Sequence, residues 1–160
     1  MRKNIEEHNG HIDKFIGDGI MAIFGLKEGL DLAARHALAA SYRMQGQLKS
    51  MNEFLAAELS TPLELRIGIH AGAAIVGELG YGSAAHFTAI GDVVNTASRL
   101  EHANKKLKTW LLVSENVLRH AGEAKLAGGI AAHVLLRGKS EALAVHGLPA
   151  GIAPRAAVGA

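Results

Sequence analysis

The chain of 160 residues contains no cysteine, which excludes disulfide bonds, thiolate catalysis and cysteine-ligated zinc sites. Aromatic residues make up only 4% of it, too few to suggest a platform on which nucleic-acid bases would stack. The net charge of +2 is also too small to favour a nucleic-acid partner. No apolar run approaches the roughly 20 residues of a transmembrane helix, and the polar start of the chain is unlike a signal peptide. We therefore expect a cytoplasmic location and no membrane contact from this segment.

What the chain does contain is typical of a globular domain: 49% of its residues are hydrophobic and 20% are charged. We expect one domain over residues 1–149 and a loose tail over residues 150–160, because the tail is short of large apolar side chains. Strands and helices alternate along the chain, which predicts an α/β sandwich with helices packed on one main sheet.

The expected helices follow from apolar spacing and from end signals. They cover residues 1–9, 30–59, 92–103 and 114–120. Asp92 and Ser114 are predicted to cap the last two of these helices through their side chains. Period-two patterns and turn residues predict strands over residues 11–16, 20–24, 63–69, 73–79, 86–90, 109–113, 133–137 and 142–148.

Lys14 and Asp18 lie four residues apart around the Gly17-Asp18-Gly19 turn of the first predicted hairpin. Alternate residues of a strand share a face, so the two side chains would point to the same side if the strand continued to the turn. An aspartate at a tight turn suits a hard cation such as Mg²⁺. From spacing alone, a turn aspartate that bonds its own backbone explains the pattern better.

Asn95 and Arg99 lie one helical turn apart on the helix expected after Gly91, and therefore on one face. An amide beside a guanidinium suits a phosphate group that carries charge. An ordinary exposed helix face is the alternative. Arg137-Gly138-Lys139-Ser140 forms a basic turn late in the chain, which is either a phosphate contact or an ordinary exposed hairpin.

Three other patterns are set aside. Residues 80–85 fit the glycine pattern of a dinucleotide-binding loop, but that motif must open a helix, and residues 86–90 have a strand pattern. Residues 138–140 end like a P-loop, but position 133 is His where the first glycine belongs. His8 and His11 flank a turn signal, which favours surface histidines over metal ligands.

The strings from Ile12 to Gly25 and from Thr88 to Glu101 are very similar to two motifs of the class III nucleotide cyclase catalytic domain. The resemblance extends from about Asn4 to Leu148. It implies a ferredoxin-like βαββαβ core with extra C-terminal strands, and a head-to-tail homodimer with active sites shared between subunits. The segment that carries this family's first strand and first metal-binding aspartate is missing from the sequence, and Glu6 and Glu7 are poor substitutes. We expect its absence to leave a gap or a rearranged pairing in the sheet.

The resemblance also implies roles for single residues. Asp18 would be the second metal aspartate, in a site that holds two Mg²⁺ or Mn²⁺ ions in the intact family. Lys14 and Thr88 would recognise the base, Asn95 would orient the ribose, and Arg99 would stabilise charge at the α-phosphate. The late basic turn would contact the terminal phosphates, with Arg137 the nearer match and Lys139 the second candidate.

These implied roles favour an adenylate cyclase that converts ATP to 3′,5′-cyclic AMP and pyrophosphate in intracellular signalling, because lysine with threonine favours adenine over guanine. Three alternatives stay open: a guanylate cyclase, a catalytically impaired module for nucleotide binding or dimerisation, and an α/β domain without a ligand. We expect little or no turnover from this chain alone, since one metal carboxylate is missing.

Overall fold

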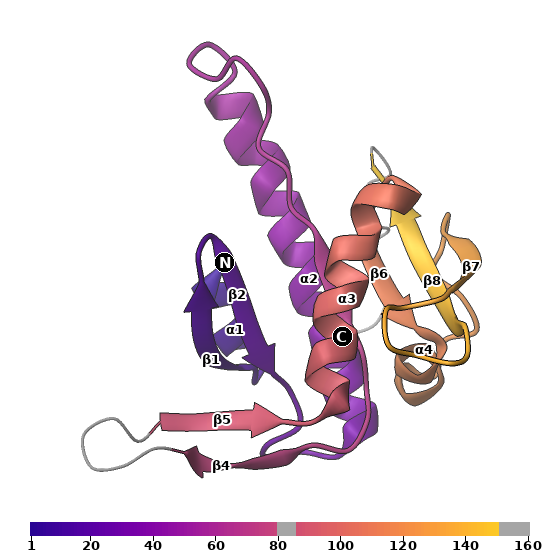
Figure 1. The fold of residues 1–160 in the computed structure, drawn as a ribbon. Helices are drawn as coiled ribbons and strands as arrows, with labels where there is room; N and C mark the ends of the chain where they lie inside the picture. Colours follow the sequence, from indigo (N-terminus) through magenta and orange to yellow (C-terminus); the bar gives the residue numbers. More distant parts are fainter. Residues whose placement is uncertain (80–85, 151–160) are drawn as a thin grey trace.

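The computed structural model describes residues 1–79 and 86–150 (Figure 1). The helices are α1 (Arg2–Glu7), α2 (Leu30–Phe54), α3 (Asp92–Leu107) and α4 (Glu115–Ala121). The strands are β1 (His11–Ile16), β2 (Gly19–Ile23), β3 (Ile67–Ile69), β4 (Ile75–Leu79), β5 (His86–Ile90), β6 (Thr109–Ser114), β7 (Ile130–Val134) and β8 (Leu143–Pro149).

A four-stranded sheet in the order β3-β6-β8-β7 forms the centre of the fold, with β3 parallel to β6 and the other pairs antiparallel. Strand β6 is buried along its whole length because both faces of the sheet are covered. Leu111 and Val113 pack in one core with residues of α2 and α4, whereas Leu112 packs in a second core with Leu100 of α3. The predicted α/β sandwich is confirmed.

The hairpins β1–β2 and β4–β5 form two further sheets (Figure 1). Within the described residues, neither hairpin is hydrogen-bonded to the four-stranded sheet as a strand neighbour, and β3 pairs only with β6. Of the two arrangements expected for the sheet, the structure has the gap, because β3 has a strand neighbour on one side only within the described residues. An open strand edge costs the hydrogen bonds that a neighbouring strand would provide.

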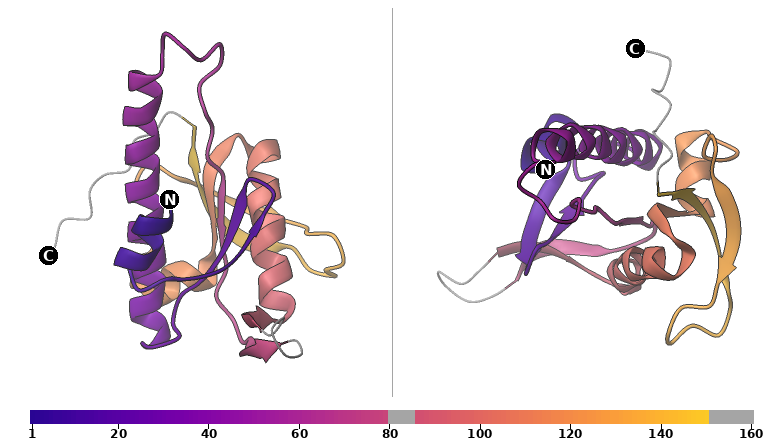
Figure 2. Two further views of the ribbon diagram at one scale, coloured as in Figure 1. Left: turned by 90° about the vertical axis from the view of Figure 1, so that its left-hand side faces the viewer. Right: turned by 90° about the horizontal axis from the view of Figure 1, so that it is seen from above.

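The helix predicted over residues 1–9 and the strand predicted over residues 73–79 were two or three residues too long, whereas α3 continues four residues beyond its predicted end at residue 103. Two larger differences occur around residue 60. Helix α2 ends at Phe54 instead of residue 59, and the strand expected over residues 63–69 is restricted to Ile67–Ile69. Residues before Ile67 lack a strand partner, and Asn52 instead binds both the N–H and the C=O of Leu63. The end of α2, with the connection that follows it, extends beyond the rest of the molecule (Figure 2), and Phe54 is 84% exposed.

The predicted caps were wrong in their chemistry. Gly91 is the N-cap of α3, and the carboxylate of Asp92 accepts hydrogen bonds from Lys139 and Thr96 instead of capping the helix. Ser114 does occupy the N-cap of α4, but its hydroxyl makes no capping bond and contacts His70. After α1, Asn9 adopts the left-handed conformation, with φ +58°.

The last hairpin is also displaced from its prediction. Strand β7 begins at Ile130 and ends at Val134, so a connection of residues 135–142 carries Arg137 and Lys139. The glycine pattern of residues 80–85 lies outside the described residues, as does the tail from residue 151. Residues 86–90 form β5, as predicted.

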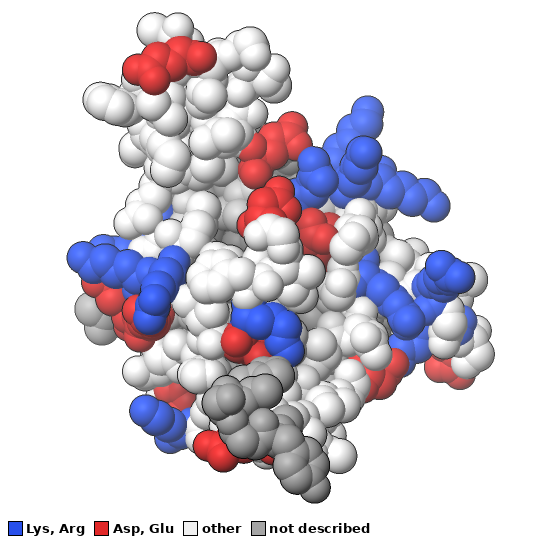
Figure 3. All heavy atoms as spheres, turned by 60° about the vertical axis from the view of Figure 1, so that its left-hand side comes forward, with Lys and Arg blue, Asp and Glu red and all other residues white. Residues whose placement is uncertain are grey.

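The surface carries charges of both signs. On the face in Figure 3, acidic and basic side chains of the described residues are interspersed over the middle of the molecule, and a group of basic side chains stands at one edge. None of the helices in residues 1–79 and 86–150 is long and apolar enough to cross a membrane.

Candidate functional site

Lys14 and Thr88, which lie 74 residues apart in the sequence, form a hydrogen-bonded pair. The ammonium Nζ of Lys14 donates to Oγ1 of Thr88 at 2.9 Å, and so connects β1 to β5. Thr88 is buried, whereas 38% of the Lys14 side chain remains exposed. The side chains of the two candidate base-recognising residues are thus in direct contact.

Asp13 completes this contact and was missed by the sequence analysis. Its side chain is fully buried. Its Oδ2 accepts the Thr88 hydroxyl proton at 2.5 Å, and its Oδ1 lies 3.3 Å from Nζ of Lys14. The one available signal was an aspartate directly before the lysine of the hairpin motif.

A β-bulge explains how two neighbouring residues reach the same partner. The pairing of β1 with β2 shifts between Ile12 and Lys14, so that Asp13 is the extra residue. Neighbours in a regular strand point to opposite faces, and a bulge re-aims one of them. Because a bulge depends on cross-strand register, spacing in the sequence does not reveal it.

The segment from β5 into α3 carries three of the candidate residues. Thr88 lies on β5, and Asn95 and Arg99 lie on α3, which begins directly after Gly91. Asn95 is exposed and Arg99 is partly buried. Helix α3 packs closely on β3, which is possible because Gly68 has no side chain. A Cβ at Gly68 would lie 2.3 Å from N of Glu101 and 2.4 Å from O of Ala97.

Asn104 also positions α3. Its buried amide nitrogen donates to the carbonyl of Ile67 at 2.9 Å, and its Oδ1 accepts the Thr109 hydroxyl at 2.8 Å. One side chain therefore connects α3 with the start of β3 and the start of β6. The sequence analysis did not single out this residue.

The connection between β7 and β8 brings a lysine to the start of α3. A turn closed by Lys139 N and Leu136 O, with Gly138 at φ +76°, places the Lys139 ammonium on the carboxylate of Asp92. A Cβ at Gly138 would lie 3.8 Å from both terminal guanidinium nitrogens of Arg99. Arg99 and Lys139 are thus brought to one region, whereas Arg137 is exposed.

The charges around this turn shift two pKa values. The hydrogen bond from Lys139 lowers the pKa of Asp92, with further contributions from Thr96 and Arg99. Burial lowers the pKa of His70, and the nearby charge of Lys139 lowers it further, while Asp92 acts in the opposite direction. His70 therefore favours its neutral imidazole form, with Nδ1 2.8 Å from Oγ of Ser114.

Asp18 is an exposed residue at the tip of the β1–β2 hairpin, next to Gly17 at φ +61°. Within residues 1–79 and 86–150, the structure contains no group of three or more His, Asp or Glu side chains that could hold a metal ion. A site for two ions needs more carboxylate ligands than Asp18 alone. The described residues therefore do not fit a complete two-ion site.

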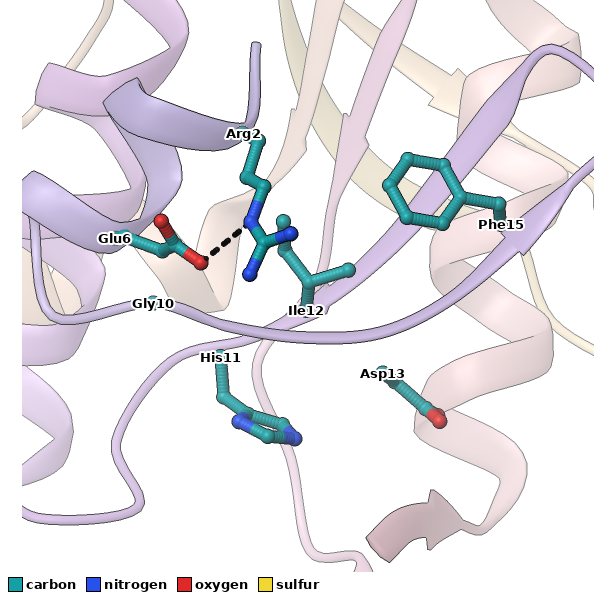
Figure 4. A pocket seen from close by; sticks show the side chains of 7 residues that line it. All are labelled: Arg2, Glu6, Gly10, His11, Ile12, Asp13 and Phe15. Carbon is teal, nitrogen blue, oxygen red and sulfur yellow. Dashed lines mark hydrogen bonds and ion pairs between the residues drawn. The ribbon is translucent and has the colours of Figure 1, made fainter. Parts of the chain in front are cut away.

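A pocket of about 320 Å³ opens beside β1 (Figure 4), with Arg2 and Glu6 in an ion pair at its edge. His11 and Asp13 project from one side of β1 and Ile12 and Phe15 from the other. None of Thr88, Asn95 and Arg99 lines this pocket. Asp13, which accepts the hydrogen bond of Thr88, is the lining residue that connects this pocket with the Lys14–Thr88 pair.

Comparison with known proteins assigns the chain to a family. Residues 1–145 match the family model described as the adenylate and guanylate cyclase catalytic domain. The chain belongs to this family, and the resemblance inferred from the two motifs is confirmed.

Named relatives are adenylate cyclases of very different organisms. The chain is 34% identical over 149 residues to the adenylate cyclase of Anabaena cylindrica, which covers 91% of this chain and 29% of the relative. It is 33% identical over 145 residues to the terminal-differentiation specific adenylate cyclase of Dictyostelium discoideum, covering 89% of this chain and 7% of the relative. The chain thus spans less than a third of either relative.

Solved cyclase structures have the same fold. The adenylyl cyclase CyaB from P. aeruginosa superposes with a TM-score of 0.80 at 26% identity, covering 99% of this chain and 79% of that one. The guanylyl cyclase Cya2 superposes with a TM-score of 0.77 at 27% identity, covering 98% and 79%. Both base specificities therefore occur among the structural neighbours.

Proposed function

We propose that this domain catalyses the adenylate cyclase reaction, the conversion of ATP to 3′,5′-cyclic AMP and pyrophosphate. The observation that supports this proposal most directly is the hydrogen bond between Lys14 and Thr88, which lie 74 residues apart in the sequence. Lysine donates hydrogen bonds and threonine accepts them, which suits the ring nitrogen and the amino group of adenine. The family membership and the adenylate cyclase relatives support the same reaction.

In this reaction the ribose 3′-hydroxyl loses its proton to water, and its oxygen attacks the α-phosphorus in line. A bond forms between that oxygen and phosphorus, the bond to the β-phosphate oxygen breaks, and pyrophosphate leaves. Asn95 would orient the ribose, and Arg99 would donate to the α-phosphate oxygens, where negative charge develops. Lys139, with Arg137, would receive the terminal phosphates. Such catalysis consists mainly of positioning and charge stabilisation.

Divalent ions, which this family generally uses, would neutralise the phosphates when bound. Asp18 is the one carboxylate that we assign to them. The proposed active unit is a head-to-tail homodimer in which one subunit supplies Asp18 and its partner supplies Lys14, Thr88, Asn95 and Arg99.

A second candidate is a module for nucleotide binding or dimerisation with little turnover. The single candidate metal carboxylate and the gap between the hairpins and the main sheet favour it. We therefore expect far slower turnover from this chain than from cyclases with both aspartates. A rate equal to theirs would contradict this expectation.

The test is to measure cyclic AMP and cyclic GMP by mass spectrometry after incubating the chain at high concentration with Mn²⁺ and ATP or GTP. We expect a low rate of cyclic AMP formation that Arg99→Ala reduces about 100-fold or more, because one lost electrostatic donor typically costs a factor of ~10²–10³. Arg119→Ala, on the exposed face of α4, is the matched control. Binding of nucleotide without any Arg99-dependent product would favour the module, and cyclic GMP as the main product would favour a guanylate cyclase.

A further inference from the structure

Asp13 places a carboxylate against the Lys14–Thr88 pair in an environment that excludes water. Its side chain has no exposed surface. Burying an ionised carboxylate is unfavourable unless charges and hydrogen bonds compensate. Here Oδ2 accepts the Thr88 hydroxyl, and the ammonium of Lys14 lies 3.3 Å from Oδ1. Within the described residues, Oδ1 makes no hydrogen bond of its own.

The hairpin has an irregularity at this position. A regular β1 would direct Asp13 and Lys14 to opposite faces, whereas the bulge brings both side chains to Thr88. Figure 4 shows Asp13 on the same side of β1 as His11. The His11 ring packs edge-on against the ring of Phe87 on β5, with the ring centroids 5.3 Å apart. The side of β1 that carries Asp13 is therefore the side that faces β5.

The protons of this cluster can be assigned from the chemistry of its members. A threonine hydroxyl has one proton to donate and two lone pairs to accept with, and a lysine ammonium only donates. Thr88 therefore accepts from Lys14, and its own proton goes to Asp13. The hydroxyl keeps one lone pair for a ligand and has no proton left to offer.

We propose that Asp13 is a positioning residue that determines base specificity, because it holds Thr88 as a hydrogen-bond acceptor beside the donor Lys14. This inference rests on the proposed function, in which the pair faces the edge of a purine. Adenine presents a ring nitrogen that accepts and a neighbouring amino group that donates. Guanine presents the reverse order, a ring N–H that donates and a carbonyl that accepts. A Thr88 hydroxyl released from Asp13 would be able to donate to that carbonyl.

The test compares binding of non-cyclisable ATP and GTP analogues to the full chain in Mn²⁺ by calorimetry. We expect the wild-type chain to prefer the ATP analogue, and Asp13→Asn to reduce the ratio of the two affinities about tenfold, the effect of one charge-assisted hydrogen bond. Asp31→Asn, a surface carboxylate paired with His120, is the matched control and should leave the ratio unchanged.

A purely structural role for Asp13 would weaken both analogues equally, and an unchanged ratio in Asp13→Asn would overturn the inference. Since Asp13 acts through Thr88, we also expect Asp13→Asn to change the ratio no further in a Thr88→Ala background. An additional full tenfold change in that background would count against it.

One measurement needs no variant and therefore does not depend on the folding of Asp13→Asn. Purine riboside triphosphate lacks the 6-amino group, so the wild-type chain should bind it about tenfold more weakly than ATP. Equal binding would overturn the role of Thr88 as an acceptor. Absence of any nucleotide binding, or a wild-type preference for GTP, would instead overturn the proposed function and this inference with it.

Discussion

Asp92 and Lys139 show how single charges are arranged around the start of α3. The carboxylate of Asp92 binds the ammonium of Lys139, and Arg99 lies close enough to lower the pKa of Asp92 as well. Asp92 is thus paired with Lys139, the lysine that would bind the terminal phosphates in the proposed function. An incoming triphosphate would have to compete with this carboxylate for Lys139.

His70 provides a test by pH. Because its pKa in the folded chain is below 6.5, the folded state binds fewer protons there than the unfolded state. The stabilisation by neutral His70 is therefore complete above pH 6.5 and is lost as the pH falls below it. We expect His70→Asn, which can keep the bond to Ser114, to reduce the fall in melting temperature between pH 7.5 and 5.5 by about 1–3 °C.

The melting temperatures can be measured by circular dichroism across that range. His102→Gln is the control, because the His102 side chain is 79% exposed. An identical fall in the wild-type chain and in His70→Asn would show that His70 does not contribute to the acid sensitivity.

At the scale of elements, the position of α3 depends on its close contact with β3. Gly68 has no side chain, and a Cβ there would collide with the helix backbone, which is unable to rotate away as a flexible side chain does. Asn104 fixes the other end of the contact through its bonds to Ile67 and Thr109. The placement of Asn95 and Arg99 follows from this packing.

Gly68→Ala should therefore destabilise the domain by about 1–3 kcal/mol, the usual cost of inserting atoms into a close-packed contact. Gly77→Ala in β4 is the matched control, because a Cβ there has no atom within 4 Å. Urea unfolding of both variants measures the difference. Equal stabilities would show that α3 moves away from β3 at little cost.

At the scale of the molecule, the β4–β5 hairpin has an apolar surface that a second copy of the chain could cover. Ile75 is 77% exposed on β4, and Ile90 is 52% exposed on β5. Exposed apolar side chains gathered on one element are typical of an association surface. This agrees with the proposed homodimer.

Sedimentation velocity, with and without Mn²⁺ and a non-cyclisable ATP analogue, tests the dimer. We expect a dimer that both additions stabilise, and we expect Ile75→Asp to weaken it tenfold or more, since burial of a large apolar side chain contributes about 1.5–3 kcal/mol. Phe54→Ser, at the exposed end of α2, should leave it unchanged. A monomer under all conditions would mean that the shared site does not form from this chain.

The family, the α/β class and most elements could be predicted from the sequence, because helical and strand periodicities and the two long motifs are local properties. Thr88, Asn95 and Arg99 were recognisable since they lie in one continuous string. Which distant groups meet could not be predicted in this way and depends on how the chain folds. The bulge that aims Asp13 at Thr88, the ion pair of Asp92 with Lys139 and the gap beside β3 all depend on pairing between segments far apart in the chain. Local spacing carries no information about that pairing, whose energy comes from contacts that exist only once the segments have packed.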